Sequence, residues 1–154
     1  MERKTKIHAE DGKQEILITR EFDLPIDLLF KAYVVPEIVE EWMGTKVLKL
    51  ENKRHGSWQF ETTDPMGNKH GFNGTIHEFV PEQKITRTFE MESANFGVQL
   101  EFLEFEKCTD DTSKLTMHVV YRSVEIRDQI LKLPFAQGVN MAHDRLQNIV
   151  HKLR

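Results

Sequence analysis

The stretch PFAQGVNMAHDRLQNIVHKLR, residues 134–154, decides the fold, because its apolar side chains recur at the spacing of one helix face. The recurring apolar residues are Phe135, Val139, Ala142, Leu146, Ile149, Val150 and Leu153. The opposite face carries polar residues such as His143, Gln147 and His151. At about 1.5 Å per residue the predicted helix is roughly 25–30 Å long. An apolar face of that length needs a wide apolar partner, which the rest of the chain must supply.

Between residues 46 and 122 apolar and polar residues alternate, which indicates β-strands. We expect strands at residues 46–51, 57–62, 71–80, 84–91, 98–105 and 114–122, after a first strand at 16–22 and a short strand at 6–9 that folds back on it. Short turns between these segments favour an antiparallel meander. The alternation leaves one apolar and one wet face, as expected of a sheet with a single helix layer on it. In segment 98–105 the apolar positions change parity, which predicts a bulge or a strand end.

Prolines mark the beginnings of two short helices after the first strand. Pro25 is expected to open one helix, and Pro36 breaks it and starts a second that runs through Trp42. A further short helix is expected within residues 123–133. The sequence thus predicts a single α+β domain over residues 1–154, an antiparallel sheet that holds a long C-terminal helix.

The composition excludes several classes of protein. With 154 residues, 39% hydrophobic residues, 30% charged residues and a net charge of -4, the chain lacks the basic balance typical of nucleic-acid-binding proteins. It has no apolar run long enough for a membrane span, no apolar signal-peptide core at its start and a single cysteine. These features together predict a cytoplasmic protein without an intrachain disulfide.

The motifs of common cofactor and metal sites are missing from the sequence. There is no phosphate-binding glycine loop, no nucleophile elbow and no paired-cysteine motif, and the seven histidines lack the spacing of metal ligands. We therefore expect no metal and no cofactor. By alternation His77 and His118 fall on the wet face of the sheet, and His143 and His151 fall on the polar side of the last helix.

One pair of charges stands out on the predicted apolar face. If the turn at Pro81 places Val80 opposite Ile85, then Glu78 lies opposite Arg87, and directly opposed residues share a face. A structural ion pair and a polar anchor for a ligand both remain open interpretations. Either requires the two charges to meet a partner, because unpaired buried charges are too costly.

Several ordered motifs resemble one known family. They are REFDLP at residues 20–25, Pro36-Glu37 with Trp42, GSWQF at 56–60, GTIHEFVP at 74–81, LTM at 115–117 and the helix centred on Leu146. The set is similar to the activator-of-heat-shock-protein-90-ATPase homologue family of the START-like (birch-pollen-allergen) superfamily and covers about residues 16–153. Ser57 and Met43 stand where the family often has a second glycine and a second aromatic residue.

The resemblance implies a helix-grip fold, in which a curved antiparallel sheet surrounds a long C-terminal helix and two small helices close one end. It also implies a cavity between the sheet and the last helix. Members of the superfamily bind apolar small molecules there, a few are cyclases, dehydratases or hydrolases, and the eukaryotic namesake is a co-chaperone. We expect this chain to bind an apolar or amphipathic small molecule, with a co-chaperone-like interaction domain as the alternative and an enzyme in third place, since no nucleophile or general acid with partners is evident. The expected cavity residues are Trp58, Phe60, Phe72, Ile76, Glu78, Arg87, Phe89, Leu100, Met117, Tyr121, Phe135, Val139 and Ala142.

Overall fold

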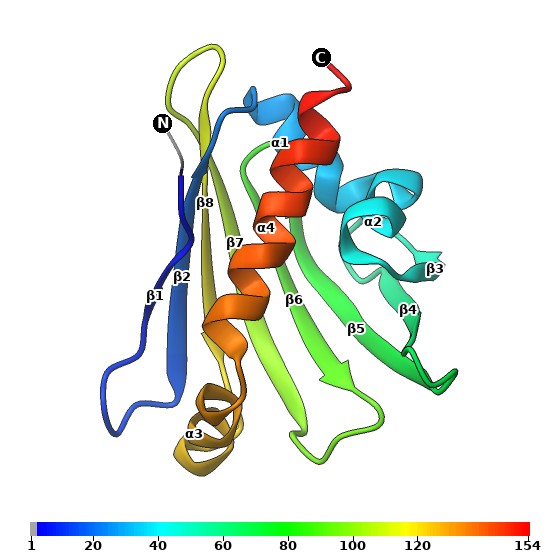
Figure 1. Cartoon of the computed structure of the whole chain (residues 1–154), viewed down its shortest axis with the longest axis vertical. Coiled ribbons are helices and arrows are strands. Elements are labelled where there is room, and N and C mark those ends of the chain that lie inside the picture. Colours follow the sequence, from blue (N-terminus) through cyan, green and yellow to red (C-terminus); the bar gives the residue numbers. More distant parts are fainter. Residues whose placement is uncertain (1–2) are drawn as a thin grey trace.

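The computed structural model of the chain describes residues 3–154, which form one curved sheet wrapped around a C-terminal helix (Figure 1). The strands are β1 (Lys6–His8), β2 (Glu15–Phe22), β3 (Lys46–Leu50), β4 (Ser57–Thr63), β5 (Lys69–Val80), β6 (Lys84–Met91), β7 (Val98–Lys107) and β8 (Ser113–Val120). The helices are α1 (Ile26–Val34), α2 (Pro36–Met43), α3 (Val124–Lys132) and α4 (Phe135–His151). Every expected strand and helix is present, most of them with shifted ends.

The sheet is antiparallel throughout, with the order β1-β2-β8-β7-β6-β5-β4-β3. Strands β3 to β8 follow one another as a meander, and β2 joins it by pairing with β8. In Figure 1 α4 crosses the inner face of this sheet, with α1 and α2 beside its C-terminal half and α3 at its N-terminal end. This arrangement confirms the expected fold class.

The two halves of α4 are held differently. Leu146 and Val150 in the C-terminal half are fully buried in the main core. Phe135, Val139 and Ala142 in the N-terminal half are only partly buried. The core therefore grips the C-terminal half, and the N-terminal half stands over a space between helix and sheet.

Helices α1 and α2 close one end of the sheet, and both their end residues and their mutual packing hold them in place. Pro36 occupies the first turn of α2, and Gly44 ends that helix in the left-handed conformation at φ 63°. Tyr33 and Trp42 pack edge to face with ring centroids 5.2 Å apart. The buried indole Nε1 of Trp42 donates a hydrogen bond of 2.7 Å to the carbonyl of Ala32.

Strand β5 contains an irregularity that changes the side-chain parity. Ile76 pairs with Arg87, but Glu78 pairs with Thr86, so the register shifts around His77. After this bulge Glu78 faces outward and Phe79 packs against the core. The expected pairing of Glu78 with Arg87 is therefore wrong.

Strand β7 is regular, and its inner face differs from the prediction. Glu101, Leu103 and Phe105 are buried on the inner side, and the strand pairs with β6 and β8 without a shift. Phe102 stacks on His118 of the outer face with ring centroids 5.7 Å apart. The predicted bulge is thus absent from β7, because the apolar residues at its start lie on the outer face.

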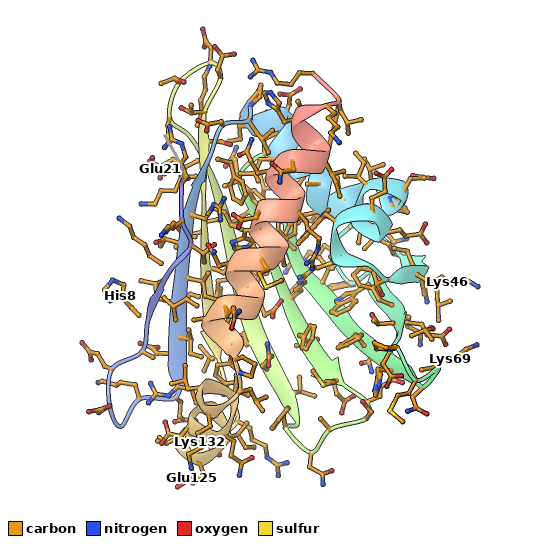
Figure 2. All side chains as sticks on the ribbon, in the orientation of Figure 1. His8, Glu21, Lys46, Lys69, Glu125 and Lys132 are labelled. Atoms are coloured by element: carbon orange, nitrogen blue, oxygen red, sulfur yellow. The ribbon has the colours of Figure 1, made fainter. Side chains whose placement is uncertain are left out.

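The labelled polar residues lie on the outside of the fold (Figure 2). Lys46 and Lys69 mark the edge formed by β3 to β5, and Glu125 and Lys132 mark the outer side of α3. All four are exposed to solvent. The inner face of the sheet is therefore where a functional site can be sought.

Candidate functional site

A cavity of about 300 Å³ lies between the inner face of the sheet and the first half of α4. Strands β2, β6, β7 and β8 form its floor and α4 forms its roof, while α3 and the β6–β7 loop frame one end. The expected residues that line it are Arg87, Phe89, Met117, Tyr121, Phe135, Val139 and Ala142. Apolar side chains dominate the wall, as in sites that hold apolar molecules.

A second cavity of about 240 Å³ adjoins the first on the side of β4 and β5. Three expected aromatic residues, Trp58, Phe60 and Phe72, line this second cavity. The two cavities share Trp42, Met43, Arg87, Phe89 and Ala142. Arg87 therefore lies at the junction of the two spaces.

Three residues expected in the cavity lie elsewhere. Ile76 is only 2% exposed and belongs to the packed core. Leu100 pairs with Thr88 and Val120 on the outer face of the sheet, because the inner face of β7 begins with Gln99 and Glu101. Glu78 is turned outward by the bulge in β5.

The outward position of Glu78 gives it partners other than Arg87. Its carboxylate accepts hydrogen bonds of 2.9 Å from Lys84 Nζ and 2.7 Å from Thr86 Oγ1. The Lys84 ammonium lowers the pKa of Glu78, and the Thr86 hydroxyl acts in the same direction. The pair with Lys84 is half exposed and belongs to the surface.

The partner of Arg87 is Glu101 on the neighbouring strand β7. Arg87 Nε donates to Glu101 Oε1 at 3.0 Å, and the two side chains are only 8% and 7% exposed. Gln99 Nε2 donates to the other oxygen, Oε2, at 3.0 Å. Sequence reasoning placed Arg87 correctly on the inner face but missed Glu101, a buried charge in the wall of an apolar cavity.

The indole ring of Trp58 packs against the guanidinium of Arg87. The Arg87 guanidinium lies 5.1 Å from the centre of the indole ring, within the range of a cation–π contact. The indole itself packs against β5 at Gly74, where a Cβ atom would lie 2.0 Å from the Thr88 carbonyl oxygen and 2.4 Å from the indole Nε1. Glycine at this position therefore makes room for the ring that positions the arginine.

Two tyrosines complete the polar part of the cavity wall. Tyr33 comes from α1 and Tyr121 directly follows β8, and both are buried. Burial raises the pKa of each hydroxyl above its ordinary value, and the nearby Glu101 carboxylate acts in the same direction. Both phenols are therefore protonated at neutral pH and available as hydrogen-bond donors.

His143 is a further polar group of the cavity and was wrongly placed on the solvent side of the last helix. It is 3% exposed because β2 and the segment before β1 cover that flank of α4. Its Nδ1 lies 2.7 Å from Thr5 Oγ1, and Arg20 Nη1 lies 3.4 Å from the same oxygen. Because arginine can only donate, the Thr5 proton is free for Nδ1, which favours the tautomer with hydrogen on Nε2.

The buried imidazole should make stability depend on pH. Burial and the Arg20 charge lower the pKa of His143 to about 4, from 6.5, although Asp144 opposes them. The unfolded chain therefore binds this proton first, and stability present above pH 6.5 is lost as the pH falls toward 4. We expect a loss of about 3 kcal/mol at pH 4, measured by urea unfolding and compared with His143→Gln, which lacks the titrating group.

The matched control for this effect is His118→Gln. His118 is 39% exposed and lies 2.8 Å from Glu15 on the outer face. Its replacement should leave the wild-type loss of stability between pH 6.5 and 4 in place. A His143→Gln protein that loses as much stability as the wild type over this range would contradict the assignment.

No group of three or more histidine, cysteine, aspartate or glutamate residues within 3–154 is placed to hold a metal ion. None of the helices in that range is both long enough and apolar enough to cross a membrane.

A curved antiparallel sheet that holds a C-terminal helix over an internal cavity defines the helix-grip (START-like) fold. The chain belongs to the family described as Activator of Hsp90 ATPase homolog 1-like protein, whose family model matches residues 23–151. The family and the fold are those of ligand-binding or co-chaperone-like domains in general.

Solved structures from several bacteria share this fold. A Rhodobacter sphaeroides protein is 19% identical with a TM-score of 0.86, covering 96% of this chain and 99% of that chain. A Mycobacterium smegmatis protein is 18% identical with a TM-score of 0.83, covering 95% and 96%. An Arthrobacter aurescens protein is 14% identical with a TM-score of 0.85, covering 96% and 91%. No curated protein matches the chain.

Proposed function

We propose that the protein binds an apolar or amphipathic small molecule in the cavity between the sheet and α4. The observation that carries this proposal is an apolar cavity of about 300 Å³ whose wall contains one buried ion pair, Arg87 and Glu101, held by hydrogen bonds. Its volume lies at the lower end of the range of roughly 300–1,000 Å³ seen for ligand sites, which favours a small ligand.

The cavity wall also reaches the surface through apolar side chains. Leu133, between α3 and α4, lines the cavity and is 53% exposed. Phe96 and Gly97 of the β6–β7 loop line the same end. A molecule with an apolar body would find continuous apolar contact from this rim to the interior, and burying that surface would favour binding.

Filling the cavity from its roof should block binding. Ala142 is partly buried on α4 and contacts both cavities, so Ala142→Trp places an indole in the proposed site. We expect the neutral dye 6-propionyl-2-dimethylaminonaphthalene to bind the wild type with micromolar to millimolar affinity and its affinity to fall at least about tenfold in the variant. Dye fluorescence titration measures both affinities, and circular dichroism checks the fold.

The control is Ala136→Trp, an equal substitution at an exposed position of the same helix. This variant should bind the dye as the wild type does. Equal dye affinity in all three proteins would place the binding outside the cavity. A wild type that binds no dye would favour the other general role of this family, an interaction domain.

We further propose a cytoplasmic location, supported by the mixed charge of the chain and its single cysteine. Fractionation of cells that produce the tagged chain tests this part of the proposal. Recovery in the soluble cytoplasmic fraction is expected, and recovery outside the cell would contradict it.

A further inference from the structure

We infer that the cavity selects an uncharged ligand carrying a hydrogen-bond-accepting oxygen, such as a ketone or an ester, and that Arg87 donates to this oxygen. The inference rests on the proposed function, since it names the class of ligand for the same cavity. Two features of the cavity wall support it: the charges of the wall balance, and its unpartnered polar groups are hydrogen-bond donors.

The charges in the wall cancel. Arg87 and Glu101 form one buried ion pair, so together they leave no net charge on the floor of the cavity. Next to the roof, buried Arg20 is paired with Asp144 at 2.9 Å. A ligand carboxylate in the cavity would add an uncompensated negative charge beside Glu101, and burying an uncompensated charge is costly.

The hydrogen-bonding groups of the pair that lack a partner are donors. Each carboxylate oxygen of Glu101 already accepts a hydrogen bond, one from Arg87 Nε and the other from Gln99 Nε2. The terminal amino groups of Arg87 have no hydrogen-bond partner among residues 3–154. Among residues 3–154, the side-chain polar atoms that are both fully buried and without a hydrogen-bond partner are Arg20 Nε and Trp58 Nε1. The Arg87 amino groups are not among them, so they are accessible from the cavities that Arg87 lines.

The neutral polar groups of the wall also act as donors. The tautomer favoured by Thr5 leaves a hydrogen on Nε2 of His143, which has no partner among the described residues. Tyr33 and Tyr121 keep their hydroxyl protons at neutral pH. The complementary ligand therefore brings acceptor oxygens and no charge.

One further cation lies near and does not alter this balance. Arg145 lines only the second cavity, is exposed to solvent, and donates its Nε to the carbonyl of Trp42 at 3.1 Å. Water and salt screen its charge, so it offers a buried anion little compensation.

Three naphthalene probes of nearly equal shape test the inference. They are 2-acetylnaphthalene, a neutral ketone; 2-naphthoate, an anion at neutral pH; and 2-ethylnaphthalene, which has no acceptor. Displacement of 6-propionyl-2-dimethylaminonaphthalene from the wild type gives their affinities. We expect the ketone to bind roughly tenfold or more tightly than the anion, and severalfold more tightly than the hydrocarbon.

The substitution Glu101→Gln should reverse the charge preference. Glutamine keeps the size of the side chain and can still accept from Arg87, but the cavity then holds one uncompensated positive charge. We expect 2-naphthoate to gain at least about tenfold over the ketone in this variant, because it supplies the missing charge to Arg87. Binding of 2-naphthoate should also raise the melting temperature of Glu101→Gln more than binding of the ketone does. This shift gives a second readout if the variant is less stable than the wild type.

The double variant Arg87→Met with Glu101→Leu removes both charges and the Arg87 donors together, while Tyr33, Tyr121 and His143 remain. In this protein the ketone should lose most of its advantage over 2-ethylnaphthalene, namely the part that Arg87 supplies. Two results would overturn the inference while leaving the proposed function intact: a wild type that binds 2-naphthoate as tightly as the ketone, or a ratio that Glu101→Gln does not change. A wild type that fails to bind the dye at all would instead contradict the proposed function and, with it, this inference.

Discussion

The variant Arg87→Met should lower the free energy of unfolding by about 3–5 kcal/mol, because it leaves Glu101 as a buried charge without its counter-ion. Methionine roughly preserves the apolar stem of arginine, so the loss would come mainly from the stranded carboxylate. Chemical denaturation at neutral pH measures the effect. The reciprocal variant Glu101→Leu strands the guanidinium and should cost a similar amount.

The double variant Arg87→Met with Glu101→Leu shows whether the two side chains stabilise the protein as a coupled pair or independently. Replacing both charges removes the desolvation problem, so most of the loss should be recovered. The control is Lys84→Met on the same strand, which breaks the half-exposed pair with Glu78 and should cost no more than about 1 kcal/mol. Losses that simply add in the double variant would show that the two side chains are not coupled.

The variant Leu146→Ala should cost about 2–5 kcal/mol, as large-to-small substitutions in a packed core do. Leu146 is fully buried where α4 meets the core formed by the sheet, α1 and α2. The backbone on either side is helical, and alanine favours a helix, so the loss would report the missing contacts and the space left behind. Urea unfolding followed by circular dichroism measures it.

Met141→Ala is the matched control for Leu146→Ala. Met141 lies on the same helix but is 50% exposed, so its truncation should change the unfolding free energy by less than about 0.5 kcal/mol. Similar small losses for both variants would mean that the core does not grip α4.

The fold could be predicted because its two periodicities are clear. The spacing of the apolar residues in 134–154 gave the long helix, and alternation through residues 46–122 gave the strands and most of their inner faces. Arg87 was correctly placed inside, because it interrupts the apolar row of Ile85 and Phe89. The family resemblance agreed with these local patterns along nearly the whole chain.

The partners of the polar residues could not be predicted, because they depend on registers and on neighbouring elements. The bulge at His77 moved Glu78 to the surface, and no local motif marks it apart from the spacing between Ile76 and Phe79. In β7 the outer face carries Phe102, so hydrophobic alternation pointed to the wrong side and concealed Glu101.

The burial of His143 has a different cause. Its flank of α4 is covered by β2 and by Thr5, which is remote in the sequence. No pattern within the helix can show which strand end covers it. Long-range contacts of this kind decide the titration behaviour of the site, and a single sequence does not reveal them.

Because the two halves of α4 are buried to different degrees, they have different roles. Residues such as Leu146 and Val150 maintain the fold, whereas Phe135, Val139 and Ala142 shape the cavity and remain partly buried. Substitutions in the first group are costly, but the second group can vary in size at a smaller cost in stability. Natural selection can therefore remodel the chamber by changing one half of the helix while the other half keeps the scaffold intact.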